Sequence, residues 1–485
     1  MTLGALGFRI GGDKAAAAPW DVYLPENFFA QQGFGKYVLN AYYDSTIAPG
    51  ATVALTQRNL LPDALALQQT GSGASLSAGG LTTVGQLDAY HRQPTGLVLT
   101  GGNAVSWLTA ANNGAVPSYP GVTGAVTLSS GASIHADAGA GIVLASPKQV
   151  TVLGSVVAPG GSIVLSADTG TTAPQPGQFN VFTPSNSRSA WLGSDATLDV
   201  SGVALANPLA APVKIGGTTV VPNTGKVLPG GSVTLSSDAG YVVTQAGSKI
   251  DVSGVSANFD RLQANGTYAS QPVWSDAGSI TLAPAYGLFA DGTMAGHAGA
   301  SQARGGTLTI LPRANSSAPG ATALVLQQSG MLLPAGLAPG KDFPTPIDPT
   351  TGLPTGLPTG VIQFAVDRLN DSGIANLVLG DGTPSPFAAP PIAFAGNVNL
   401  TLPESVTLNT GRIAAIGMDQ LSTLLSTPAK PAGGNSALAD LLAQPPAVPL
   451  GTTVTISAPY VAFAGPMSPS GHPPSRRSPR VPTRR

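Results

Sequence analysis

Polar and apolar residues alternate over short stretches that recur along the chain. In the stretch Ser232 to Leu235, Val233 and Leu235 share one face, and Ser232 and Thr234 share the other. A period of two predicts a strand with one buried face. One such strand cannot bury its apolar face alone, so we expect successive copies to stack about 4.8 Å apart around a shared interior. The same alternation occurs at 51–55, 162–165, 279–282 and 307–310.

Short motifs repeat together with the strands, which indicates a repeat architecture. Pro-Gly opens three of them, at Pro49, Pro159 and Pro229, and predicts a type II turn with glycine at positive φ. The motif Leu198-Asp199-Val200-Ser201-Gly202 returns as Ile250-Asp251-Val252-Ser253-Gly254. The spacing is 70 residues from Gly161 to Gly231 but 47 from Gly231 to Gly278, so the predicted coils are irregular, with inserted loops. We therefore predict an all-β fold, a parallel β-helix with a short helical excursion near 411–445.

The remaining pattern suggests further elements. The densest β region is 121–168, with strands at 126–129, 132–136, 141–146, 149–158 and 161–167. Short helices are expected at 25–31 and within 60–69. Leucines at i, i+3 and i+4 spacing predict helices at 418–427 and 436–444. More strands are expected over 361–379 and 391–408, and a final strand pair over 452–464.

These elements divide the chain into five parts. Residues 1–44 are an aromatic-rich segment, 45–330 carry β-helix coils, and 331–395 form a Pro/Gly-rich linker or insertion. Residues 396–465 carry further coils with the helical excursion. Residues 466–485 are a basic tail of prolines and arginines, expected to be disordered. The alternative for this tail is a basic patch that binds an anionic surface.

The first segment holds nine of the 27 aromatic residues. Trp20, Tyr23, Tyr42 and Tyr43 are candidate glycan-stacking residues. The alternative, which we prefer, is a packed cap, because repeat arrays need atypical terminal units.

Composition narrows the function classes. Charged residues make up 9% of the chain against about 25% in typical domains, and the net charge is −1. No basic stripe runs through residues 1–465, so a nucleic-acid partner is not expected. The absence of cysteine excludes disulfides and thiol chemistry. No apolar run approaches the length of about 20 residues that a transmembrane helix needs, and the first residues do not resemble a signal peptide.

No catalytic constellation, cofactor motif or metal-ligand spacing emerges. His91, His135, His297 and His472 are not spaced as a metal site. Acidic catalysis would draw on six aspartates, Asp137, Asp168, Asp195, Asp199, Asp238 and Asp251. Asp199 and Asp251 share a motif position, as do Asp168 and Asp238, so turn hydrogen bonding explains them better than catalysis. We therefore expect no enzyme, no cofactor and no metal.

The combination of Gly160-Gly161-Ser162-Ile163-Val164-Leu165 with Leu198 to Gly202 and Ile250 to Gly254 resembles the filamentous haemagglutinin family. These are large bacterial exoproteins of two-partner secretion. The resemblance covers 45–330 and 396–465, and the opening Trp20 to Pro25 with Phe28-Phe29 is also similar to segments of such proteins. It implies a right-handed parallel β-helix, export through an outer-membrane partner transporter, and adhesion. The family's secretion domain with its Asn-Pro-Asn-Gly signature is missing, so the chain resembles an internal or C-terminal piece.

Together these observations predict an adhesive shaft that is extracellular or displayed on a bacterial surface. Its partners would be an outer-membrane two-partner-secretion transporter and glycans or proteins of host or bacterial surfaces. The alternative is a carbohydrate-active β-helix enzyme, a polysaccharide lyase or a glycoside hydrolase. A further alternative is an autotransporter passenger, which would require a C-terminal barrel.

Overall fold

The computed structural model describes residues 1–73, 75, 80–102, 123–168, 188–215, 217–313, 323–343, 360–380, 390–426 and 452–464. The predicted helix at 436–444, His472 and the predicted tail 466–485 lie outside these ranges. The fold is mostly β and is built on long parallel sheets.

Three parallel sheets make up most of the molecule. In each sheet, every strand is hydrogen-bonded to the strand named before it and to the strand named after it. The 11-stranded sheet holds β1 (Thr2–Ala5), β4 (Lys36–Ala41), β9 (Gly96–Thr100), β12 (Gly141–Ala145), β15 (Ser162–Ser166), β22 (Ser232–Ser236), β27 (Ser279–Ala283), β30 (Gly306–Ile310), β33 (Ile374–Leu379), β36 (Ser405–Asn409) and β39 (Tyr460–Ala464). The 8-stranded sheet holds β28 (Gly287–Ala290), β23 (Tyr241–Thr244), β16 (Ser189–Leu192), β13 (Gln149–Val152), β10 (Val126–Leu128), β5 (Ser45–Ile47), β2 (Gly7–Ile10) and β3 (Asp21–Leu24). The 6-stranded sheet holds β29 (Thr293–Ala295), β24 (Lys249–Asp251), β17 (Thr197–Asp199), β14 (Ser155–Val157), β11 (Ser133–Ala136) and β6 (Thr52–Leu55).

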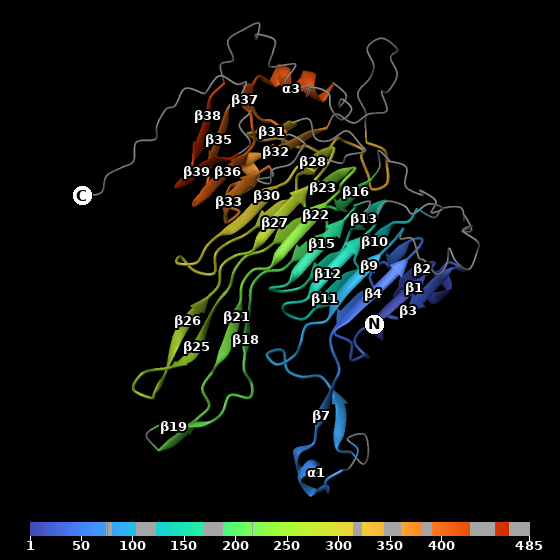
Figure 1. The fold of residues 1–485 in the computed structure, drawn as a ribbon, viewed down its shortest axis with the longest axis vertical. Coiled ribbons are helices and arrows are strands. Elements are labelled where there is room, and N and C mark those ends of the chain that lie inside the picture. Colours follow the sequence, from blue (N-terminus) through green and yellow to red (C-terminus); the bar gives the residue numbers. More distant parts are fainter. Residues whose placement is uncertain are drawn as a thin grey trace.

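The chain visits these sheets in a repeating order. From β12 to β29 it passes from the 11-stranded to the 8-stranded to the 6-stranded sheet and back, four times in succession. Each strand therefore pairs with the strand of the same sheet in the next round, and Figure 1 shows the strands lying one above another along the long axis. Parallel pairing of this kind needs a crossover between partners, and the other two sheets supply it.

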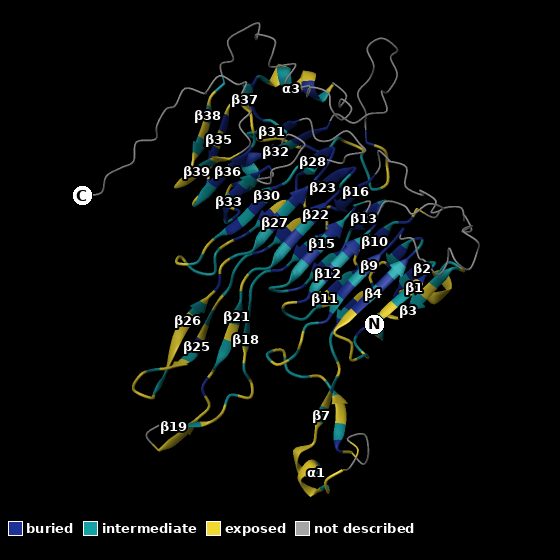
Figure 2. Cartoon of the chain, in the orientation of Figure 1, coloured by how far each residue is buried: buried dark blue, intermediate teal, exposed yellow. Residues whose placement is uncertain are grey.

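Apolar side chains line up from strand to strand inside the molecule. Ile163 of β15 is in register with Val233 of β22, and Val233 with Ile280 of β27; Leu165 and Leu235 are paired in the same way. Val233 and Leu235 are 0% exposed. The prediction that these strands stack and turn their apolar faces inward is confirmed. One continuous buried cluster draws residues from all three sheets, and buried positions are dark blue along the stacked strands in Figure 2.

The predicted Pro-Gly turns form in two ways. Gly50 and Gly160 have φ of 72° and 61°, as a type II turn requires. Gly230 does not have a positive φ, so the predicted type II turn is wrong at this position. A Cβ at Gly230 would lie 2.0 Å from the carbonyl oxygen of Val252, so glycine is needed there for close approach to the backbone of the next round.

The predicted strand over 149–158 is wrong, because the structure divides it into β13 and β14. Gly154 lies at the break, where the chain leaves the 8-stranded sheet for the 6-stranded sheet. A Cβ there would lie 2.0 Å from the carbonyl oxygen of Ala132. The position of this corner is therefore set by a backbone contact with the preceding round. The alternation of polar and apolar residues along the strand cannot predict such a contact.

Smaller elements complete the fold. A four-stranded parallel sheet holds β32 (Val361–Ala365), β31 (Ala323–Gln327), β34 (Ile392–Ala395) and β37 (Ile413–Ile416), and β35 (Val398–Thr401) pairs with β38 (Val454–Ser457). In the described part of the chain, the helices are α1 (Ala64–Gln69) and α3 (Met418–Leu425), with 3-10 turns η1 (Lys14–Ala16), η2 (Glu26–Phe28) and η3 (Val366–Leu369). The predicted helix at 418–427 and the strand pair at 452–464 are confirmed, and Leu421 and Leu424 of α3 are buried. Strands β32, β33 and β34 lie within the Pro/Gly-rich part 331–395.

The aromatic-rich segment lies at one end of the sheets. Its strands β1 and β3 are the terminal strands of the 11-stranded and 8-stranded sheets. Phe29 is fully buried beside Tyr37, whose hydroxyl donates a hydrogen bond to the Phe29 carbonyl at 3.1 Å. The ring centroids of these two residues are 5.0 Å apart, so aromatic side chains cover the interior at this end.

Candidate functional site

The four predicted glycan-stacking residues divide into a group of three and one separate residue. Tyr42 and Tyr43 meet edge to face with centroids 5.0 Å apart, and Trp20 meets Tyr43 in the same manner at 6.3 Å. Tyr43 is only 5% exposed. Tyr23 lies apart from these contacts and donates its hydroxyl to the Gly12 carbonyl at 2.9 Å. The three rings thus pack mainly against one another rather than forming a flat platform.

Two of the candidate carboxylates serve the turns that follow their strands. Asp199 and Asp251 are paired in register on β17 and β24. Asp199 accepts a hydrogen bond from the Ser201 amide at 2.9 Å, and Asp251 accepts one from the Ser253 amide at 3.0 Å. The predicted turn hydrogen bonds are confirmed for Asp199 and Asp251, whereas Asp168 binds Arg313 and the Ser236 hydroxyl instead. Burial raises the pKa of Asp251, but hydrogen bonds from Ser253 and the Lys249 ammonium outweigh burial and hold that pKa below its ordinary value.

Three other candidate carboxylates face arginines. Asp137 receives two hydrogen bonds from Arg92, at 2.6 Å from Nε and 2.5 Å from Nη2. Asp168 pairs with Arg313 at 2.8 Å, and Asp238 lies 3.7 Å from Arg188. The sixth candidate, Asp195, is exposed. Within the described ranges, no group of three or more His, Asp or Glu side chains is arranged to hold a metal ion.

The most distinctive surface is made by three antiparallel excursions that the periodic pattern of apolar and polar residues did not predict. They are β7 (Asn59–Pro62) with β8 (Thr82–Gly85), β18 (Val203–Ala206) with β21 (Gly225–Leu228), and β25 (Ser256–Leu262) with β26 (Tyr268–Trp274). The second is extended by β19 (Val213–Ile215) and β20 (Thr218–Val220). Each excursion follows a strand of the 6-stranded sheet and precedes a strand of the 11-stranded sheet. All three therefore project from one side of the molecule (Figure 1). We call this side the hairpin face.

Specific contacts hold the second and third excursions together. Asp260 accepts a hydrogen bond from the Asn223 amide at 2.7 Å, and the Asp260 amide donates to the Asn223 carbonyl at 2.8 Å. The buried ring of Phe259 lies over Gly225, where an added Cβ would be 2.2 Å from the ring. The second excursion also contacts the segment between β8 and β9. There Lys226 donates to the Tyr90 carbonyl at 2.9 Å, and its ammonium lies 4.6 Å from the centre of the Tyr90 ring. The two hairpins therefore form one supported surface.

The hairpin face also carries exposed apolar side chains. Its large examples are Leu60, Leu65, Leu67, Val84, Leu209, Val220, Val221, Leu262 and Trp274. Exposed apolar side chains concentrated on one surface are typical of interaction sites.

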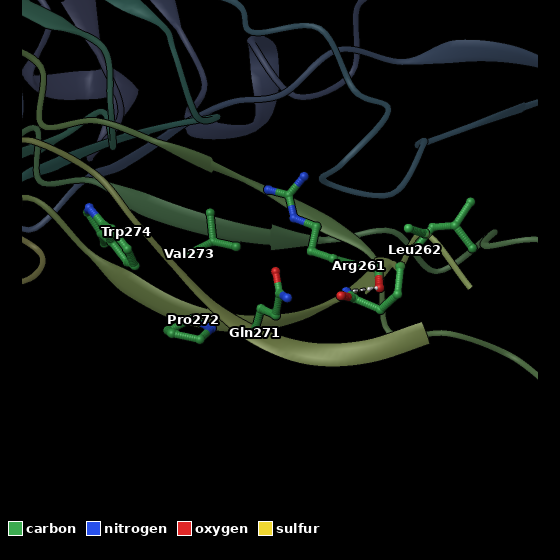
Figure 3. Close-up of a pocket in the computed structure, with 8 residues that line it drawn as sticks. Arg261, Leu262, Gln271, Pro272, Val273 and Trp274 are labelled. Atoms are coloured by element: carbon green, nitrogen blue, oxygen red, sulfur yellow. Dashed lines mark hydrogen bonds between the residues drawn. The ribbon is translucent and has the colours of Figure 1, made fainter. Parts of the chain in front are cut away.

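A hollow of about 520 Å³ lies along the β25–β26 hairpin (Figure 3). Arg261, Gln271 and Trp274 are among its lining residues, and Trp274 is 41% exposed. Amide and guanidinium groups supply hydrogen-bond donors, and an indole offers an apolar face. This mixture suits a ligand with both hydroxyl groups and apolar ring faces.

The sequence contained one signal for this hairpin. Asn265-Gly266 joins its strands, Gly266 has a φ of 78°, and the Asn265 side chain accepts a hydrogen bond from the Thr267 amide at 3.0 Å. Asn-Gly between two strands is a strong short-range indication of a hairpin.

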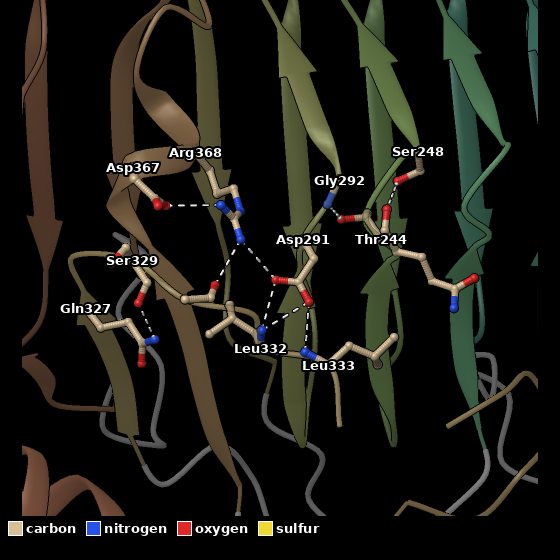
Figure 4. A network of polar contacts seen from close by, with 12 residues as sticks. Thr244, Ser248, Asp291, Gly292, Gln327, Ser329, Leu332, Leu333, Asp367 and Arg368 are labelled. Atoms are coloured by element: carbon tan, nitrogen blue, oxygen red, sulfur yellow. Dashed lines mark hydrogen bonds and ion pairs between the residues drawn. The ribbon is translucent and has the colours of Figure 1, made fainter. Parts of the chain in front are cut away.

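The buried carboxylate of Asp291, which was not among the candidate residues, holds a neighbouring segment in place (Figure 4). The Asp291 side chain is 0% exposed and accepts hydrogen bonds from the backbone amides of Leu332 and Leu333, at 2.9 and 2.8 Å. Arg368 approaches the same carboxylate at 3.4 Å and donates to the Gly330 carbonyl at 2.9 Å. These bonds fix the segment 330–343, which we call the strap.

The strap covers an aromatic cluster on the outside of the 8-stranded sheet. Phe343 of the strap stacks on Tyr241 with centroids 3.6 Å apart, and its ring is nearly parallel to that of Phe289. Trp191 belongs to the same buried cluster. Burial raises the pKa of the Tyr241 hydroxyl well above its usual range, and the neighbouring Tyr286 raises it further. This surface is therefore occupied by the chain itself.

No helix within the described ranges combines the length and apolar character that crossing a bilayer would require. Comparison of the chain with protein-family models, with curated proteins and with solved structures finds no match.

Proposed function

We propose that the chain is a right-handed parallel β-helix that forms the adhesive shaft of a secreted or surface-displayed bacterial exoprotein of the filamentous haemagglutinin type. The observation that carries this proposal is the repeating passage through three parallel sheets around one apolar core. Parallel crossover connections are right-handed in about 98% of cases, which supports the handedness. A stack of this kind grows along one axis and suits a spacer that holds a binding surface away from a cell.

The hairpin face is the proposed contact surface for glycans or proteins of host or bacterial cells. Loops and excursions on a rigid scaffold commonly carry binding, and here the contacts of Asn223 with Asp260 and of Lys226 with Tyr90 support the excursions. The low content of charged residues agrees with recognition by hydrogen bonds and apolar rings rather than by charge. Export through an outer-membrane two-partner-secretion transporter belongs to the same proposal.

Two measurements test the shaft. Small-angle X-ray scattering of the purified chain should give an elongated particle, and antibodies against it should label intact producing cells. The chain should also bind cultured cells or members of a glycan array. A compact particle, or labelling only after cell lysis, would contradict the proposal.

The carbohydrate-active enzyme remains the alternative, and it predicts a different result. Incubation with acidic and neutral polysaccharides would then produce new reducing ends or unsaturated uronates. We expect neither product, because the repeated carboxylates Asp199 and Asp251 bind turn amides, while Asp137 and Asp168 pair with arginines.

A further inference from the structure

The two ends of the sheet stack differ. At the N-terminal end, Phe29 and Leu24 of β3 are buried, so side chains close the interior there. At the opposite end, β39 is the terminal strand of the 11-stranded sheet, β37 is the terminal strand of the four-stranded sheet, and β38 pairs with β35. Each of these three strands therefore has one edge that pairs with no other strand in the described part of the chain.

The apolar columns that fill the core continue into β39. Val461 is in register with Val406 of β36, and Phe463 with Leu408, so all four side chains belong to the inner face of the 11-stranded sheet. Val406 and Leu408 are 0% exposed, whereas Phe463 is 66% exposed. The core side chains of the last strand thus reach solvent at this end of the stack.

The other strands at this end lead to the same conclusion. Ile413 of β37 is exposed, although its register partner Ile392 on β34 is buried. Residues 452–464 contain no charged residue, and neither β38 nor β39 contains proline. Edge strands are usually protected from pairing by charges, proline or bulges. The sequences of β38 and β39 carry no such charge or proline, so their edges are suited to pair with another chain.

We propose that the end formed by β37, β38 and β39 is the contact surface for a second copy of the chain. A matching partner must itself present an open apolar core and unpaired strand edges. Because Phe29 closes the N-terminal end, the same end of a second copy fits best. A contact between identical surfaces closes as a two-fold dimer. The contact continues the strand pairing that already links β36 to β39, and it is independent of the proposed adhesive function.

The two-fold axis also specifies the register. The two β39 strands run antiparallel, with Ala462 opposite the same residue of the second copy and Val461 opposite its Phe463. Residues opposite each other in an antiparallel pair lie on the same face, so the valine and phenylalanine side chains of both copies cover the open core. The paired Cα atoms of Ala462 would be about 4.5–5.5 Å apart.

The first test measures association of the full chain. Sedimentation equilibrium over about 1–100 μM should show a monomer that converts to a dimer and to no larger species. Phe463→Lys should raise the Kd of the dimer at least about tenfold, because it buries a charge among apolar side chains. Leu262→Lys is the matched control, since Leu262 is 63% exposed but lies on the hairpin face, and it should leave the Kd unchanged.

The second test uses cross-linking and does not require Phe463→Lys to fold. The chain contains no cysteine, so Ala462→Cys introduces a single thiol, and the expected Cα separation lies within the range of about 4.4–6.8 Å for a disulfide. Mild oxidation should give a covalent dimer of Ala462→Cys and leave Leu262→Cys monomeric.

Several results would overturn the proposal. A full chain that stays monomeric at every concentration would show that no second copy binds this end. Species larger than a dimer would indicate open head-to-tail stacking instead of a two-fold contact. Equal cross-linking of Ala462→Cys and Leu262→Cys, or loss of the dimer in Leu262→Lys alone, would place the contact elsewhere.

Discussion

Gly231 packs directly against the carbonyl oxygen of Gly161 on the neighbouring strand. A Cβ added to Gly231 would lie 1.9 Å from that oxygen, and one added to Gly278 would lie 1.8 Å from the oxygen of Gly231. The three glycines occupy the same motif position in successive rounds of the chain. The repeated glycine is therefore required by the short distance between stacked backbones. Its recurrence in the sequence is a consequence of that stacking.

Gly231→Ala should destabilise the protein by about 1–3 kcal/mol or more, because overpacking against backbone forces neighbouring strands apart. The measurement is the free energy of unfolding in urea. Gly35→Ala is the matched control, since no heavy atom lies within 4 Å of its added Cβ and its φ is not positive. Equal stability of the two variants would show that the strands are free to separate locally.

The sequence predicted the parts of the fold that depend on local periodicity. Alternation at Val233 and Leu235 identified the buried face, and leucine spacing identified α3, because these patterns reflect burial within one element. The break at Gly154 was missed because it depends on a contact with Ala132, which belongs to the preceding round.

The candidate site was less accessible to sequence reasoning. The hairpin face depends on contacts such as Asn223 with Asp260, which join different excursions and leave no periodic trace. Of the four aromatic candidates, Trp20, Tyr42 and Tyr43 lie together and Tyr23 lies apart, and the sequence pattern could not report that the three rings pack edge to face. Asn265-Gly266 is the signal in the sequence from which the hairpin that lines the hollow could have been predicted.

Asp251→Asn should weaken the dependence of stability on acid pH. Since the pKa of Asp251 is lowered in the folded state, its contribution is present above the unfolded pKa of about 3.9 and is lost as pH falls through the folded value. Asparagine keeps an oxygen that can accept the Ser253 amide, so the turn is preserved. Urea denaturation from pH 5.5 to 2.5 should show a shallower acid-side decline in the variant.

Asp199→Asn is the control for this experiment. Asp199 accepts the equivalent turn hydrogen bond, but Thr197 stands where Lys249 lies beside Asp251. We expect the decline with acid to remain closer to that of the unsubstituted chain. Indistinguishable pH profiles for the unsubstituted chain and Asp251→Asn would refute the charge argument.

Asp291→Asn should loosen the strap. The substitution removes the negative charge that faces Arg368 and one of the two oxygens that accept the Leu332 and Leu333 amides. Leaving buried donors unsatisfied costs about 1–3 kcal/mol, so exchange of these two amides should accelerate roughly 5- to 150-fold. Hydrogen-exchange mass spectrometry of the strap measures this, with the exposed Asp419→Asn as control. Unchanged exchange would mean that Phe343 and its aromatic partners hold the strap without the carboxylate.

If the proposed adhesive function holds, Trp274→Ala should weaken binding of the chain to cells or glycans by at least about tenfold, or about 1.4 kcal/mol. Trp274 is the aromatic residue among those that line the hollow on the β25–β26 hairpin, and truncation to alanine removes its ring. The loss should be specific, because Trp274 lies on a two-stranded excursion outside the continuous core, so Tm should hardly change. Phe34→Ala is matched in exposure, 42% against 41%, and lies at the aromatic end of the sheets. If Phe34→Ala lost binding and Trp274→Ala retained it, the contact surface would lie with the N-terminal aromatic residues instead of on the hairpin face.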